Sequence, residues 1–202
     1  MPMDAARLAL RQATGAVHER LHGVPVFARL AAGRIAPEEY VRLLRRLLGF
    51  HLGVEAALGA APSLAGYGIE VEARRRSPML MADLVALGAA PLAPVASLPA
   101  PDCAAWAMGC LYVTEGSTLG GQHLARALDG VLPGEAGRSF LRGYGARHGA
   151  MWRDCCVAIE ACGAEAGRLA AMIDGAEATF ARFEAWFAGP EASLGHAPSI
   201  TG

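Results

Sequence analysis

The sequence predicts an all-α protein with a single domain. Alanine, leucine and arginine dominate, β-branched residues are sparse, and no stretch alternates apolar and polar residues between hairpin turns. The chain has 202 residues, 53% of them hydrophobic, which is enough to bury one sizeable core. We expect this domain to span residues 1–188 and residues 189–202 to form a disordered tail.

The first helix is expected from Asp4 to about His22, where Gly23 and Pro25 end it. Pro37 fits the first turn of a second helix, because proline lacks the N–H group that this turn leaves without an intrahelical partner. That helix should continue to about Leu58. Apolar residues at steps of four or five indicate the buried face of the first helix: Leu8, Ala13, Val17 and Leu21.

A third helix is predicted from Ser77 and Pro78, with serine as the N-cap and proline in the first turn. It should extend through Leu87 and stop at Gly88. The apolar stretch 84–101 ends in a segment with four prolines, which favours a loop over a membrane-spanning helix.

Three more helical patterns complete the domain. The first runs from about Cys103 to Leu128, with Asp102 as its expected cap. The other two cover about 137–161 and 164–187. No repeat and no second domain is evident in the sequence.

Composition and charge exclude several classes of function. Eighteen basic and nineteen acidic residues give a formal charge of −1, which argues against nucleic acid as a partner. Every basic residue is arginine, so lysine Schiff-base chemistry is excluded and an anion must be bound by guanidinium. Charged residues interrupt any signal-peptide core in 1–22, so we expect a cytoplasmic protein without a membrane partner. The five cysteines lack CxxC or zinc-binding spacing, which favours reduced, partly buried thiols.

Glycines inside the helical pattern 103–128 suggest a site. Each costs about 1 kcal/mol relative to alanine within a helix. Gly116 and Gly120 share a face, where a flat ligand could approach the backbone or the helix could bend. Close packing of two helices explains the same spacing equally well. The glycines and the neighbouring polar groups that could hold an ordered water are Gly116, Gly120, Gly121, Ser117, Thr118 and Gln122.

Two histidines lie one turn apart on the first helix. Either His18 or His22 could ligate a metal through a neutral ring nitrogen, although unliganded histidines are more common. Glu19 and His22 form a single Glu-x-x-His, whereas a di-iron bundle needs two. A single histidine suits heme (haem), because the porphyrin supplies the in-plane ligands.

Two arginines are candidates for binding carboxylates. Arg11 lies two turns before His18 on nearly the same face, and Arg153 follows Trp152 on a later helix. Both could equally be solvated surface residues. We assign Trp106, Tyr112 and Trp152 to the core.

Two segments in the right order carry a resemblance to a known family. They are TGAVHER at 14–20 and LYVTEGSTLGGQ at 111–122. With the turn at 32–34 and Tyr40, they resemble the biliverdin-producing heme oxygenases over about residues 7–187, and most of all the bacterial branch that supplies bilin to bacteriophytochromes.

The resemblance implies a single-domain helical bundle with heme between the first, proximal helix and a distal helix kinked at glycine. His18 matches the proximal iron ligand of the family. Gly116 and Gly120 match the distal glycines that lie against the heme face, with Gly121 beside them. Arg11 and Arg153 match basic residues near the heme propionates.

Two positions depart from the family pattern. Many members have an aspartate after the first distal glycine, where it orders the water that helps to deliver a proton; here this residue is Ser117. A hydroxyl can position water but holds no charge. The residue one turn after the proximal histidine is often glutamate and here is His22, which would donate less electron density to His18 and could compete for iron.

The activity that the resemblance implies is cleavage of heme, as cofactor and substrate, to biliverdin, CO and ferrous iron. Ser117, Gly116 and Gly120 would be the catalytic residues. Expected partners are heme, O₂, an electron donor such as a ferredoxin or a reductase, and a bacteriophytochrome that accepts biliverdin. The alternative is a heme carrier or sensor on the same fold that does not degrade heme, which needs a distal ligand such as His123. A third possibility is a helical protein without heme, whose glycines only pack helices.

Overall fold

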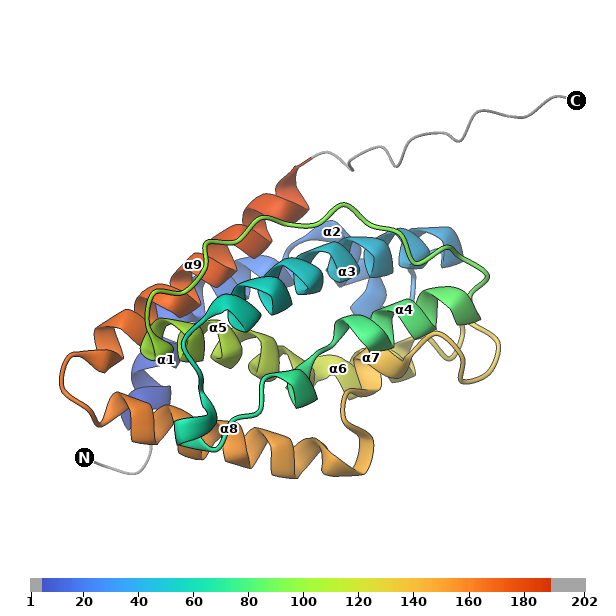
Figure 1. Cartoon of the computed structure of the whole chain (residues 1–202). Coiled ribbons are helices and arrows are strands. Elements are labelled where there is room, and N and C mark those ends of the chain that lie inside the picture. Colours follow the sequence, from blue (N-terminus) through green and yellow to red (C-terminus); the bar gives the residue numbers. More distant parts are fainter. Residues whose placement is uncertain (1–4, 190–202) are drawn as a thin grey trace, which may run out of the picture.

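The computed structural model describes residues 5–189, and every regular element in that range is helical, as predicted. In Figure 1 the helices form one bundle, with α5 in its middle and α9 running alongside. The α-helices are α1 (Ala5–His22), α2 (Pro25–Ala31), α3 (Pro37–Ala60), α4 (Ser77–Ala86), α5 (Ala104–Gly116), α6 (Gly121–Ala127), α7 (Ser139–Arg142), α8 (His148–Gly163) and α9 (Arg168–Ala188). Short 3-10 helices are η1 (Ala65–Tyr67), η2 (Glu72–Arg74), η3 (Ser117–Gly120) and η4 (Gly145–Arg147).

The core consists of two clusters of buried side chains. One surrounds α5 and takes residues from α1, α3, α8 and α9. The other fills the space between α3, α4, α6 and α7. Phe183 and Trp186 on α9 pack against both clusters and join them. The cysteines are free, as expected, and four of the five are buried.

The closest helix contact in the bundle is between α5 and α9, and glycines on both helices permit it. A Cβ atom on Gly109 would lie 2.0 Å from the Met172 carbonyl oxygen and 2.7 Å from the Ala176 nitrogen. A Cβ atom on Gly175 would lie 2.1 Å from the Trp106 carbonyl oxygen. The two backbones therefore meet directly, and α5 is fixed along its length by α9.

The proline-rich stretch before α5 is a loop, as predicted, and it runs along α3 (Figure 1). The Ala96 amide donates to the Gly49 carbonyl at 3.0 Å. Cβ atoms on Gly49 and Gly53 would each lie 2.0 Å from a carbonyl oxygen of this loop, so both glycines serve a close approach. Within residues 5–189, no helix is long and apolar enough to cross a membrane.

The starts of α4 and α5 were predicted within one residue, but the residues expected to cap these two helices do not do so. Asp102 does not cap α5; the N-cap is Cys103, whose Sγ accepts from the Trp106 amide at 3.5 Å. Ser77 is the first residue of α4, and its side chain does not cap the helix. Instead, Glu55 of α3 accepts hydrogen bonds from the Arg76 and Ser77 amides at 2.7 and 2.8 Å. A carboxylate from a distant helix thus replaces the local cap.

Several predicted boundaries need correction. Pro25 begins α2, which the sequence analysis missed, because proline suits the first turn of a helix as well as the end of one. The predicted helix 137–161 is broken, since Gly143 and Gly145 have positive φ values of 62° and 56° and only α8 is continuous. The last helix starts after Gly167, at φ 78°. Of the expected tail, only Gly189 is described, and residues 190–202 lie outside the described range, as does Asp4.

The buried face of α1 agrees only in part with the prediction, since Val17 and Leu21 pack against the core but Leu8 does not. Leu8 is 55% exposed, whereas the fully buried residues are Ala6, Leu10 and Thr14. The Thr14 hydroxyl donates to the Leu10 carbonyl at 2.8 Å, so it is satisfied within the helix and can be buried. The apolar pattern did not indicate the whole buried face, because Ala6 and Thr14 occupy core positions.

Gly109→Ala should lower the free energy of unfolding by about 1–3 kcal/mol or more, because the new Cβ overlaps the α9 backbone. Gly59→Ala is the matched control: Gly59 is exposed on α3 with open space beside it. It should leave stability unchanged or raise it by up to about 1 kcal/mol. Urea denaturation followed by circular dichroism measures both, and equal effects would refute the contact.

Candidate functional site

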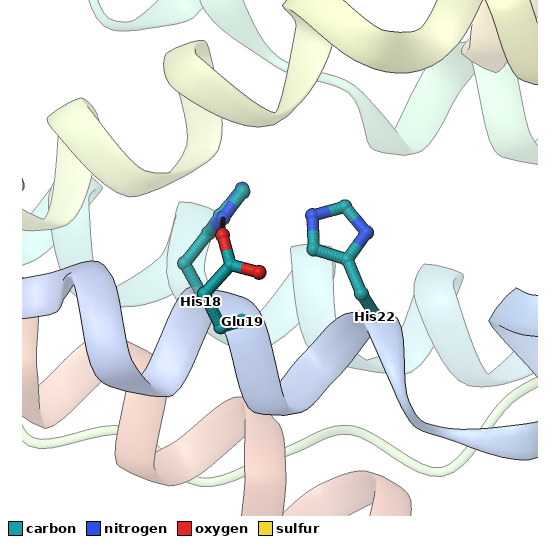
Figure 2. Close-up of side chains that lie close together, drawn as sticks. All are labelled: His18, Glu19 and His22. Atoms are coloured by element: carbon teal, nitrogen blue, oxygen red, sulfur yellow. Dashed lines mark ion pairs between the residues drawn. The ribbon is translucent and has the colours of Figure 1, made fainter.

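The imidazole of His18 lies on the open side of α1. Its side chain is 58% exposed, and its ring contacts Phe180 of α9 edge to face at 6.4 Å between centroids. Figure 2 shows His18, Glu19 and His22 on the side of α1 that faces the pale yellow-green ribbon of the α5–α6 segment. The backbone of α1 packs against α9 and α8. His18 and His22 are thereby both presented to the space in front of the distal segment.

The distal segment is interrupted where the glycines occur, as predicted. α5 ends at Gly116, a turn of 3-10 helix follows, and α6 begins at Gly121. Gly116 and Gly120 have φ values of −59° and −83°, which any residue adopts. A Cβ atom on Gly116 would meet nothing closer than Trp152 at 3.9 Å, and one on Gly120 would meet nothing within 4 Å. Neither backbone conformation nor packing within the described chain requires glycine at these two positions.

Gly121 has a different role from its neighbours. A Cβ atom there would lie 2.2 Å from the Leu141 carbonyl oxygen of α7, so this glycine lets two backbone segments touch. The packing explanation is therefore correct for Gly121 and fails for Gly116 and Gly120. The expected role of Gly121 in binding the cofactor stays a prediction, because the contact with Leu141 already accounts for a glycine at this position.

The two hydroxyl groups of the distal segment are already oriented by the helix. Ser117 is exposed and its hydroxyl donates to the Thr114 carbonyl at 2.7 Å. Thr118 is buried and donates to the Glu115 carbonyl, also at 2.7 Å. Because each hydroxyl hydrogen is used in this way, the lone pairs of each oxygen remain to accept a hydrogen bond from water.

Arg11 and Arg153 are both exposed. Among residues 5–189, neither guanidinium has a hydrogen bond or an ion pair. The register of α1 against α8 is given by Arg7, whose side chain donates to Glu160 at 3.2 Å and to the Cys156 sulfur at 3.4 Å. Arg11 is one turn after Arg7 on α1, and Arg153 is about one turn before Cys156 on α8. Both therefore lie on the same side of this contact, toward the C-terminal end of α1 and the N-terminal end of α8.

Two aromatic residues assigned to the core lie at the edge of the site. Trp152 is half-buried and is the neighbour nearest to Gly116. Tyr112 of α5 is half-buried; burial raises the pKa of its hydroxyl, while Thr14 and the charge of Arg11 oppose that rise. Arg11 is thus close enough to α5 for its charge to act there. Both residues also pack against the core, as assigned, and only their aromatic type could have indicated their places.

A buried ion pair anchors the end of α5, and the sequence analysis missed it. Arg74 Nη1 donates to Glu115 Oε2 at 2.6 Å, with both side chains at most 5% exposed. The Tyr144 hydroxyl donates to the other carboxylate oxygen, and Arg74 also donates to the Met151 carbonyl at 3.1 Å. Burial raises the pKa of Glu115, against the opposing effects of Tyr144 and Arg74. Glu115 directly precedes Gly116, so this network fixes the residue at which the helix breaks.

A second buried cation lies beside this network. The Arg76 guanidinium lies over the Phe140 ring at 4.4 Å and the Tyr144 ring at 5.5 Å, and donates to the Phe140 carbonyl. His51 packs edge to face against Phe140, and burial together with the charge of Arg76 lowers its pKa to about 3. His51 is therefore neutral at physiological pH. A water-sized space of about 10 Å³ beside Arg76 and His51 separates this cluster from Thr114.

Comparison with known proteins adds to these observations. A curated protein named heme oxygenase, from Xanthomonas campestris pv. campestris (strain 8004), is 36% identical over 155 residues, which are 76% of this chain and 92% of that protein. The solved structure of the NO- and CO-bound heme oxygenase from Neisseria meningitidis matches at a TM-score of 0.72 and 26% identity, over 96% of this chain and 98% of that one. No family model matches the chain.

The fold and the site define a helical bundle in which the exposed His18 and His22 of α1 face a helix that is interrupted at glycines without close neighbours. The chain belongs to the heme oxygenase family.

Glu115→Ala should lower the free energy of unfolding by about 3–5 kcal/mol, because it leaves the buried Arg74 charge without a partner. Glu72→Ala is the matched control, since Glu72 is 82% exposed and pairs with Arg75 at the surface. The control should cost less than about 1 kcal/mol. Urea denaturation of both apoproteins checks the difference, and similar midpoints would contradict the anchoring role.

His51→Gln should flatten the pH dependence of stability. Because the pKa of His51 is about 3 in the folded state and about 6.5 when unfolded, the unfolded chain alone takes up this proton as pH falls below 6.5. Between pH 7 and 5 the wild type should lose about 2 kcal/mol more than the variant. Denaturation at several pH values measures this difference; parallel curves would show that His51 is protonated in the folded protein.

Proposed function

We propose that this protein binds heme between α1 and the α5–α6 segment and cleaves it, with O₂ and a reductant, to biliverdin, CO and ferrous iron. Family membership supports an enzyme for which heme is both cofactor and substrate. The observation that carries the location is the open face at Gly116 and Gly120, which no part of the described chain explains. A planar ring that approaches the backbone explains it.

The residues around this face suit heme. His18 offers an exposed imidazole. One such donor would be sufficient to hold the iron, because the porphyrin itself provides the in-plane donors. The absence of side chains at Gly116 and Gly120 leaves room for the ring on the side opposite His18. When bound, heme supplies the iron that activates O₂ and the ring that is opened.

Arg11 and Arg153 are the proposed partners of the heme propionates. Both guanidinium groups are exposed and uncommitted within residues 5–189, and both lie toward the same end of the α1–α8 contact. Guanidinium forms directional, charge-assisted hydrogen bonds with carboxylate. Two such contacts at one edge would fix the rotation of the ring, and thus which ring carbon faces the distal segment.

Ser117 is the proposed water-positioning group. Its hydroxyl hydrogen is held by the Thr114 carbonyl, so its oxygen can accept a hydrogen bond from a water but not donate one to it. Proton delivery in this chain therefore relies on that water rather than on a carboxylate at position 117. Gly116 and Gly120 contribute by keeping the approach of water and O₂ free of side chains.

We further propose that the biliverdin serves as bilin chromophore for a bacteriophytochrome, and that electrons come from a ferredoxin or a reductase. The segments TGAVHER and LYVTEGSTLGGQ support the first proposal through their resemblance to that branch. A cytoplasmic location belongs to this proposal, because a reduced donor of this kind would act there.

His18→Ala should abolish turnover and the spectrum of histidine-ligated heme while the helical content stays unchanged, because the residue is exposed. The experiment titrates apoprotein with hemin, adds ascorbate under air, and follows the Soret band and the broad red absorption of bilin. Wild-type protein should lose the Soret band and gain the bilin absorption.

The control for this experiment is His123→Ala, which removes another exposed histidine, on α6. It should leave the spectrum and turnover unchanged. A wild-type heme complex that survives the reductant, together with a spectrum altered by His123→Ala, would instead establish a carrier or sensor. Unchanged turnover of His18→Ala would refute the assignment of the ligand.

A further inference from the structure

Three potential metal ligands lie together on the last turns of α1. One ligand atom from each of His18, Glu19 and His22 lies within 4.8 Å of the others, and all three residues are exposed. The two imidazole rings lie edge to face with their centroids 4.8 Å apart. Figure 2 shows both rings extending from the same side of the helix, with the Glu19 carboxylate beside His18. Among residues 5–189, this is the one group of three such ligands.

Little in the protein competes for these side chains. His18 Nδ1 is 3.9 Å from the Glu19 carboxylate, and no other polar partner of either imidazole occurs among residues 5–189. Because the residues are exposed, an ion bound there keeps part of its hydration and pays little for desolvation.

We propose that His18 and His22, with Glu19 as a third ligand, chelate a late first-row divalent cation in the heme-free protein, and that this cation and heme exclude each other. The exclusion rests on the proposed role of His18 as heme ligand, whereas the chelate does not. Zn²⁺ represents the class, since borderline imidazole ligands suit Zn²⁺, Cu²⁺ and Ni²⁺.

The geometry supports chelation without a change in the helix. Residues four apart on a helix have Cβ atoms about 5–6 Å apart, so two imidazoles can bind one ion. Tetrahedral Zn²⁺ with bonds of about 2.0–2.1 Å needs nitrogen atoms about 3.3 Å apart. The ligand atoms already lie within 4.8 Å of one another, so rotation of the exposed side chains can bring the two nitrogens to this separation.

Exclusion follows from the chemistry of imidazole. A neutral imidazole has one lone pair for a metal and carries a hydrogen on its other nitrogen. If His18 gives its lone pair to a chelated cation, none remains for heme iron, whichever ring nitrogen is used. The cation and the heme iron therefore compete for the same imidazole of His18. Cation binding raises the apparent dissociation constant of heme by a factor of 1 + [M]/Kd, where [M] and Kd refer to the cation.

The first experiment measures Zn²⁺ binding to the heme-free protein by competition with a chromophoric chelator. His22→Ala should weaken Zn²⁺ binding by about tenfold or more, since it removes one of two imidazoles. His123→Ala removes an exposed histidine outside the cluster and should leave Zn²⁺ affinity unchanged. Equal Zn²⁺ affinity of wild type and His22→Ala would overturn the chelate and would show binding elsewhere, for example at the half-buried thiol of Cys103.

The second experiment titrates hemin with Zn²⁺ at ten times its measured Kd. The apparent Kd of heme should rise about 11-fold for the wild type and no more than about twofold for His22→Ala, which keeps His18 but binds Zn²⁺ at least about tenfold more weakly. If the apparent Kd of heme for the wild type does not change with Zn²⁺, the proposed exclusion is wrong. Failure of the proposed function is distinguishable: if His18→Ala loses Zn²⁺ but keeps the wild-type heme spectrum, the chelate stands and the heme ligand lies elsewhere.

Discussion

The buried carboxylate of Glu115 is the constraint on which the site depends. It holds Arg74 and Tyr144 at the point where α5 ends, while α9 fixes the rest of α5 through the contacts at Gly109 and Gly175. With both ends of the helix set, the backbone at Gly116 has little freedom of position. The distal face of the site is therefore held by the rigid centre of the bundle rather than by a surface loop.

Glycine serves two opposite purposes within six residues of this segment. At Gly121 the missing side chain lets α7 touch the backbone, which is a packing role. At Gly116 and Gly120 the missing side chains leave open space in an ordinary helical conformation. The proposed reason for the second pair is a ligand from outside the chain, and heme suits it because His18 would supply the one donor that the iron needs from the protein.

Sequence patterns predicted what is local and missed what depends on distant contacts. The ends of α1 and α3, the loop before α5 and the break at the distal glycines follow from proline, glycine and periodicity. The cap of α4 by Glu55 and the pairing of Arg74 with Glu115 join residues 21 or more positions apart, so no window of sequence contains them. The spacing of Gly116, Gly120 and Gly121 in the sequence could not distinguish a packing role from a ligand-binding role. The neighbours of each glycine in space make that distinction, and they come from other parts of the chain.

The most direct test of this account measures two properties of Gly120→Leu against the wild type: its heme affinity and the stability of its apoprotein. Position 120 has helical φ and ψ values and no atom within 4 Å of a new Cβ, so the apoprotein should unfold at the wild-type midpoint. The leucine side chain would occupy the place of the ring, and hemin binding should fall by about tenfold or more. Wild-type heme affinity in this variant would contradict the account.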